Sequence, residues 1–279
     1  MVGADAVVVD LADIPIDDSA PGVRANVAGW LKTYSDPLIA KKAFARWIRI
    51  KPMDAPLWRE DLVAVMKGAP DGVILPKTRG PADIRQLAAE LYEIEQKLGL
   101  KHNSTKIMPQ IGETAQAALT LGELTQDQQP RLIGFTWNAA NLARRLSAKR
   151  THDVHNNWAG ALQHVRNMTL LLGKAMGVTP IETASSAESD YDTVFNDAQA
   201  AKHDGFTGMF ASRPKHIEAI NEAYSISLDE RAEAEALLNS FASQKEAMKA
   251  GNPPSDPLAN IPDPEPVEAE PKQQIRAIG

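Results

Sequence analysis

The sequence predicts an α/β fold, namely a TIM-type (β/α)8 barrel of which seven β/α units are visible. Short apolar runs recur seven times, and each is followed by a segment of helical character, as in successive βαβ units. The first run, around Val7–Val9, is apolar on both faces, which is typical of a parallel strand covered by helices. Periodicity alone leaves an open doubly wound sheet as an alternative, because such a sheet also accommodates seven strands.

The apolar runs predict the strands in chain order. They are residues 4–11, 45–52, 71–77, 106–112, 131–137, 179–184 and 206–212. Helices are expected between them, and the clearest lies after the third run. There an apolar stripe from Ile84 to Leu98 has helical spacing, and Gly99 follows as a candidate C-cap. Residues 164–177 and 192–205 also end in glycine, which predicts two further outer helices.

The C-terminal region differs in character from the rest. We expect a barrel domain over residues 1–225 and one long helix over residues 226–251, which has acidic residues early and lysines late. Seven prolines fall within residues 252–279. This composition builds neither helix nor sheet, and it predicts a disordered tail.

Composition excludes several classes of function. A net charge of −6 disfavours a nucleic-acid partner, which would require a basic face. The chain has no cysteine, so disulfides and thiolate sites are excluded. No stretch reaches the roughly 18 to 20 apolar residues of a membrane span, and the N-terminus lacks signal-peptide features. We therefore expect a cytoplasmic protein without a membrane partner.

Seven units are one short of a closed barrel. The abrupt start on a buried strand would be explained if this strand were the second of eight. We therefore expect the upstream reading frame to encode a further strand and helix.

The C-terminal ends of the strands are where a parallel barrel places its chemistry. The candidates there are Asp10, Asp13, Arg49, Lys51, Lys77, Arg79, Glu113, Trp137, Asn138, Asn141, Glu182 and Arg213. For any single residue, the alternative is a helix cap or a solvated charge. His152 and His155 lie three residues apart, but no carboxylate motif accompanies them.

Several motifs together resemble those of one enzyme family. "RWIRIKP", "DGVILPKTRG", "GETAQAAL", "IGFTWNAANLARRL" and "GVTPIET" follow, in order and spacing, the landmarks of the HpcH/HpaI aldolase and citrate lyase β-subunit-like family, in its malyl-CoA and citramalyl-CoA lyase branch. The resemblance covers residues 3 to about 248. It implies a Mg²⁺-dependent carbon–carbon lyase that releases a 2-keto acid such as oxaloacetate. It also implies a thioester substrate on CoA or an acyl carrier, and a homo-oligomer, trimeric or hexameric.

The resemblance also implies site residues. Arg49 matches the substrate-binding arginine of Arg-x-Asn-Pro, and Glu113 matches the metal-binding glutamate of Ile-Glu-Thr-Ala. Asn141 stands where the family has the second metal carboxylate. Asp10 and Asp13 match the first and last residues of Asp-Leu-Glu-Asp, so Arg49, Asp10 and Asp13 are the catalytic candidates.

Three carboxylates of the family pattern are replaced here, by Ala12, Ala140 and Asn141. Mg²⁺ is usually anchored by one or two carboxylates, so these changes predict a weak metal site. The resemblance thus leaves two hypotheses. One is an active Mg²⁺-dependent lyase, and the other is a non-catalytic or re-purposed homologue that keeps the barrel without the metal-carboxylate site.

Overall fold

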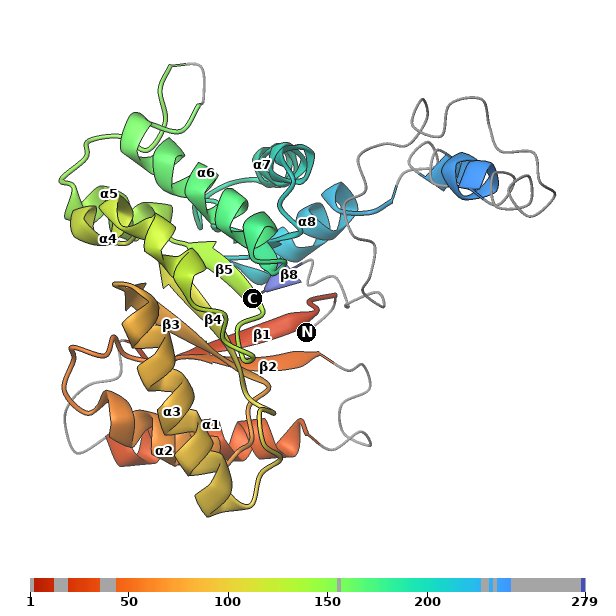
Figure 1. Ribbon diagram of the computed structural model, residues 1–279. Coiled ribbons are helices and arrows are strands. Elements are labelled where there is room, and N and C mark those ends of the chain that lie inside the picture. The colour runs from red at the N-terminus through yellow and green to blue at the C-terminus, as the bar shows by residue number, and fades with distance from the viewer. Residues whose placement is uncertain are drawn as a thin grey trace, which may run out of the picture. The chain divides into compact units, whose positions relative to one another are not determined.

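The computed structural model describes residues 3–12, 20–35, 44–154, 157–226, 231–232, 235–241 and 277–278. Its strands form a closed barrel in chain order, and every pair of neighbours is parallel. The predicted α/β barrel is therefore confirmed, and the open doubly wound sheet is excluded. In Figure 1, α1, α2 and α3 pack along one side of the strands, and α6, α7 and α8 along the other.

The first seven strands agree with the predicted runs. Their bounds are β1 Ala6–Asp10, β2 Ala45–Arg49, β3 Gly72–Thr78, β4 Lys106–Ile111, β5 Gly134–Trp137, β6 Thr179–Glu182 and β7 Gly208–Phe210. Register sets the height of their ends: Asp10 pairs with Arg49, so β1 and β2 finish level with one another. This level end places two charged side chains at the same rim.

The helices lie between the strands. Their bounds are α1 Ala20–Thr33, α2 Trp58–Met66, α3 Pro81–Leu98, α4 Ala115–Leu119, α5 Ala139–Arg145, α6 Gly160–Ala175, α7 Tyr191–Asp204 and α8 Ile217–Ala223. In α3 the predicted stripe is buried from Ile84 to Ile94, whereas Leu98 is 37% exposed. Gly99 ends this helix with a φ of 67°, the left-handed conformation that glycine adopts without a steric cost.

An eighth strand closes the barrel, and it comes from the C-terminal end of the chain. β8, Ala277–Ile278, pairs with β7 on one side and with β1 on the other. The expectation that residues 252–279 form no sheet is wrong for these two residues. Neither Ala277 nor Ile278 is a proline, so both residues keep the backbone N–H that a strand ladder requires. The expectation that β1 is the second of eight strands is wrong in this structure, because eight strands close the barrel and β1 pairs with β2 and β8.

Contacts divide the chain into two units, Met1–Tyr224 with Ile275–Gly279, and Ser225–Gln274. In the second unit, residues 231–232 and 235–241 are helical. Ile226, the first residue of the predicted 226–251 helix, is described and is not helical. The remaining residues of that predicted helix, and residues 252–276 and 279 of the predicted tail, lie outside the described residues. None of the described helices has the length and apolar content that crossing a bilayer requires.

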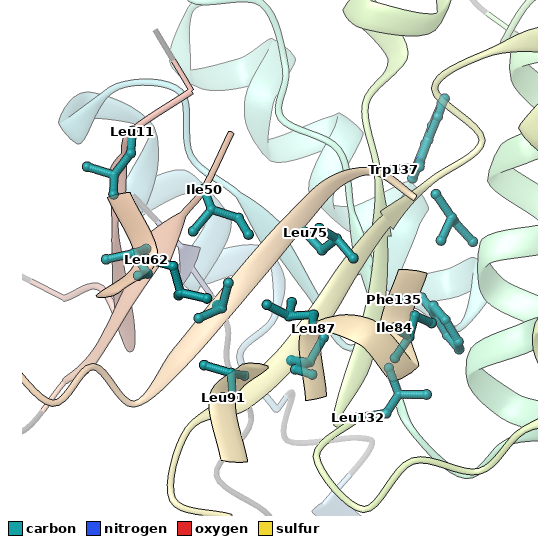
Figure 2. Packing of buried hydrophobic residues seen from close by; sticks show 14 of the residues in the cluster. Leu11, Ile50, Leu62, Leu75, Ile84, Leu87, Leu91, Leu132, Phe135 and Trp137 are labelled. Atoms are coloured by element: carbon teal, nitrogen blue, oxygen red, sulfur yellow. The ribbon is translucent and has the colours of Figure 1, made fainter. Parts of the chain in front are cut away.

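Three apolar clusters hold the barrel, and one of them joins α7 to α8. The largest cluster lies between strands and helices, and Figure 2 shows that it takes Leu75 from β3, Leu87 from α3 and Phe135 from β5. A smaller cluster is formed by side chains of alternate strand positions, among them Trp47 and Ile74. Gly72 makes room for Trp47, because a Cβ at residue 72 would lie 2.3 Å from the indole ring. The strands are thereby fixed, and their ends form a rigid frame for the site.

Candidate active site at the mouth of the barrel

The C-terminal ends of the strands surround one cavity of about 1180 Å³. The last residues of five strands line it, namely Asp10, Arg49, Trp137, Glu182 and Phe210. Barrels of this kind hold their chemistry at this face, because each strand end carries its own loop and side chain into a shared space. The cavity is therefore the candidate active site.

Arg49 and Asp10 form an ion pair at the rim of this cavity, where the guanidinium Nη2 donates to the Asp10 carboxylate. Their side chains are 24% and 40% exposed, so the pair is open to a ligand. Asp10 also accepts a hydrogen bond of 2.9 Å from the backbone N–H of Ala12, which fixes the turn after β1. A guanidinium held in this way presents the planar fork that binds a carboxylate through two bonds.

Glu113 follows β4 and is almost fully buried. Its carboxylate accepts hydrogen bonds from the backbone N–H of Lys77 and from Asn141 Nδ2, the latter at 2.7 Å. Lys77 reaches it because the β3 register shifts between Leu75 and Thr78, and Lys77 adopts a φ of 52°. Such a conformation is costly for a residue other than glycine and tends to be kept where it serves a site.

Burial is the main influence on Glu113 and raises the pKa of its carboxyl. The hydrogen bonds from Lys77 and Asn141 and the positive charge of Arg49 oppose this rise. The Arg49 guanidinium is thus near enough for its charge to act on the Glu113 carboxyl. Glu113 lies behind the cavity wall, because it is not among the side chains that line the cavity.

Asn141 lies in the first turn of α5, next to Glu113. Asn138 caps this helix, and its side chain accepts a hydrogen bond of 2.9 Å from the Asn141 backbone N–H. Asn141 Nδ2 donates to Glu113, and Asn141 Oδ1 accepts from Arg144 Nη2 at 2.5 Å. The polar atoms of this amide are thus engaged on both sides.

Of the five predicted site residues, Asp10 and Arg49 line the cavity, whereas Glu113 and Asn141 are hydrogen-bonded to each other and are not part of its lining. Asp13 lies outside the described residues. Lys51, a further strand-end candidate, points elsewhere: its ammonium is buried against Asp61 of α2 at 2.8 Å. It therefore stabilises the packing of β2 on α2 rather than the site.

The donor set can be tested against Mg²⁺. Within the described ranges, no three His, Cys, Asp or Glu side chains gather in a way that could hold a metal ion. The Glu113 carboxylate and the Asn141 amide nevertheless lie side by side, and hard oxygen donors of these two types suit Mg²⁺. In the observed orientation Asn141 Nδ2 faces Glu113, so only the Glu113 carboxylate would hold an ion here unless the amide turned its oxygen toward that ion.

A buried ion pair in the cavity wall was not predicted from the sequence. Arg166 of α6 donates through Nε to Glu182 at 2.6 Å, and through Nη1 it pairs with Asp204 at 2.7 Å. Trp137 Nε1 donates to the same glutamate at 2.6 Å. One sequence signal could have revealed this ion pair. Arg166 lies on the apolar face of a helix, and a buried charge there requires a partner.

Aromatic side chains line the cavity beside this pair. Trp158 packs edge-on against Trp137, with ring centroids 5.0 Å apart. The ring centroids of His152 and Trp158 are 4.0 Å apart. A short bridge between His152 and Trp158 holds this loop. His152 thus contributes to an aromatic wall, whereas His155 lies outside the described residues.

Comparisons with known proteins agree with this architecture. The citrate lyase subunit beta of Leuconostoc mesenteroides subsp. cremoris is 25% identical over 253 residues, which span 90% of this chain and 78% of that protein. A (3S)-malyl-CoA thioesterase of Cereibacter sphaeroides is 26% identical over 250 residues, with the same two shares. The citrate lyase beta subunit from M. tuberculosis, solved with oxaloacetate and magnesium, has the same fold. Its TM-score is 0.61 at 22% identity, over 79% of this chain and 86% of that one.

The match extends to the level of a family. The model described as HpcH/HpaI aldolase/citrate lyase aligns with residues 1–214, more than half of the 279 residues. The family membership expected from the sequence motifs is therefore confirmed, and this chain belongs to the HpcH/HpaI aldolase/citrate lyase family.

Proposed function

We propose that this protein is a carbon–carbon lyase that cleaves an acyl thioester and releases a small 2-keto acid. The Arg49–Asp10 pair at the cavity rim is the observation that supports this most, since it offers a carboxylate-binding fork beside a buried carboxyl. The similarity to a citrate lyase subunit and to a structure with bound oxaloacetate and magnesium supports the same class of chemistry.

Arg49 is proposed to bind the substrate carboxylate that the 2-keto acid product retains. The Asp10 carboxylate orients the guanidinium and, in this proposal, accepts the proton of the substrate hydroxyl. As that proton leaves, the adjacent C–C bond breaks and its electron pair passes to the thioester enolate, which then takes up a proton. The products are the 2-keto acid and a shorter thioester. Asp13 remains a further catalytic candidate on the resemblance alone.

Mg²⁺ is proposed to bind at Glu113, with the Asn141 amide oxygen as a second ligand. Such an ion, when bound, would stabilise the negative charge that develops on the substrate hydroxyl oxygen as this oxygen becomes the keto oxygen of the product. The amide brings no charge, so we expect weaker binding than at a site with two carboxylates. Glu113 would have to exchange its hydrogen bond from Asn141 for the ion.

The remaining cavity is proposed to take the thioester. Its volume of about 1180 Å³ is far larger than a keto acid requires. Trp137, Trp158 and His152 offer an apolar wall for the acyl or pantetheine part. A relative is a (3S)-malyl-CoA thioesterase, which supports CoA as the thioester carrier. An acyl carrier protein is the alternative, because its acyl group is also attached through pantetheine. A trimer or hexamer is proposed on the resemblance alone.

Calorimetry can test the proposal. Oxaloacetate and pyruvate are titrated into wild-type protein with and without MgCl₂, and into Arg49→Met. Arg85→Met serves as a matched control, because Arg85 is an arginine that is 53% exposed and pairs with Asp127 away from the cavity. We expect binding to wild type and to Arg85→Met and a loss of roughly tenfold or more in Arg49→Met. Folded wild-type protein that binds neither acid would contradict the proposal.

A non-catalytic homologue that only binds an acid is the second candidate. The Asn141 amide favours it, because this amide already satisfies Glu113 without a metal. The discriminating variant restores two of the three replaced family carboxylates, as Ala140→Glu with Asn141→Asp. A gain of metal binding without keto acid release favours the non-catalytic homologue, whereas turnover by unmodified protein excludes it.

A further inference from the structure

The orientation of the Asn141 amide is dictated by its two neighbours. Asn141 Nδ2 donates to Glu113 Oε1 at 2.7 Å, and Arg144 Nη2 donates to Asn141 Oδ1 at 2.5 Å. An ionised carboxylate only accepts hydrogen bonds, and a guanidinium only donates them. The NH₂ group of the Asn141 amide is therefore directed toward Glu113, and the amide oxygen is directed toward Arg144.

This orientation opposes metal binding at Glu113. Mg²⁺ binds oxygen and not a protonated amide nitrogen. The oxygen of Asn141, the atom that could ligate, is turned to Arg144. Rotating the amide would place its NH₂ group against the guanidinium, donor against donor, and both hydrogen bonds would be lost. The guanidinium also adds a positive charge near the place where a cation must enter.

The interaction is local to one helix turn. Arg144 follows Asn141 by three residues on α5, a spacing that puts two side chains on the same face. Arg145 is also exposed, but among the described residues it makes no hydrogen bond with Asn141. Arg145 thus offers a matched control of the same charge on the same helix.

We propose that Arg144 is a positioning residue that holds the Asn141 amide in a metal-excluding orientation and thereby sets the Mg²⁺ affinity of the site. The inference rests on the proposed metal site at Glu113 and Asn141. It assigns the weakness of that site to two causes, the lost carboxylate and the arginine that turns the remaining oxygen away.

Metal binding by the full chain provides the test. Free Mn²⁺ is measured by its electron paramagnetic resonance signal during titration of wild type, Arg144→Gln, Arg144→Lys and Arg145→Gln. We expect Arg144→Gln to bind Mn²⁺ roughly tenfold more tightly than wild type, since second-shell partners typically change metal affinity by about 10 to 100-fold. Arg144→Lys retains a donor to the amide oxygen, and Arg145→Gln retains Arg144, so both should bind as weakly as wild type.

Two further variants separate the possible outcomes. Adding Asn141→Leu to Arg144→Gln should abolish the gain, because the amide oxygen is then absent. Adding Asn141→Asp to Arg144→Gln supplies a carboxylate and shows whether the site can bind metal at all. If this variant binds Mn²⁺ and Arg144→Gln is no tighter than wild type, the Arg144 inference is overturned while the metal site stands. If neither variant binds Mn²⁺, both the inference and the proposed metal site fail. Keto acid binding through Arg49 is measured separately.

Discussion

Arg166→Met tests the buried ion pair in the cavity wall. The Arg166 and Glu182 side chains are only 8% and 4% exposed and 2.6 Å apart. Removing the arginine leaves a buried carboxyl with the Trp137 indole and the Thr183 backbone N–H as its remaining donors. Breaking a buried pair in this way typically costs about 3–5 kcal/mol, so we expect the free energy of unfolding to fall by about that amount at neutral pH.

The dependence on pH follows from Glu182. Burial is the main influence on this carboxyl and raises its pKa, whereas the charge of Arg166 opposes the rise. Without Arg166, folded Glu182 holds its proton to higher pH than unfolded Glu182 does. Stability is therefore retained below the ordinary carboxyl pKa and lost as pH rises through the folded value. The cost of Arg166→Met should accordingly be larger at pH 7 than at pH 5.

Urea unfolding, followed by circular dichroism and tryptophan fluorescence, measures this cost. Arg166→Met combined with Glu182→Leu removes both charges and should recover much of the lost stability, because an apolar replacement of a buried pair is often neutral. Arg59→Met is the control, since Arg59 is 49% exposed and pairs with Glu90 at the surface. An Arg166→Met protein as stable as the control, or a double variant no better than the single one, would refute the reasoning.

Three further predictions follow from other contacts. Hydrogen bonds and charge from Arg131 outweigh the effect of burial and lower the pKa of Glu95, so the pair stabilises the fold above the ordinary glutamate pKa. Glu95→Gln should therefore flatten the loss of stability as pH falls below about 4.5 in acid titrations. Gly72→Ala should cost about 1–3 kcal/mol in urea unfolding because its Cβ would meet the Trp47 ring, and an unchanged midpoint would contradict that packing. Trp158→Ala should weaken acyl-CoA binding in calorimetry while leaving pyruvate binding unchanged, and an equal loss of both would count against a separate thioester region.

The strands were predictable because their signal is local. Seven apolar runs mark seven strands, and the level ends of β1 and β2 follow from the barrel itself. β8 could not be predicted, because two residues after a proline-rich stretch carry no periodicity. These two residues form a strand because they pair with both β7 and β1, and the sequence does not show that β7 and β1 lie one strand apart.

The candidate site was predictable where a residue stands at a strand end, as with Asp10 and Arg49. Their ion pair follows once β1 and β2 are neighbours. Contacts that depend on side-chain direction could not be predicted. The arginine beside the Asn141 amide and the strained backbone of Lys77 that reaches Glu113 are two examples. Nothing in the sequence distinguishes Arg144 from other arginines on helices, or Lys77 from other lysines on strands.

Arg49 and the Glu113–Asn141 pair are proposed to act on one ligand in the cavity. Relaxation of ¹³C-labelled pyruvate by protein-bound Mn²⁺ tests this proposal most directly, because paramagnetic relaxation falls steeply with distance. We expect strong relaxation enhancement with wild-type protein, and its loss both in Arg49→Met, which releases the acid, and in Glu113→Gln, which releases the metal. Pyruvate that binds wild-type protein but relaxes no faster when Mn²⁺ is bound would contradict the account.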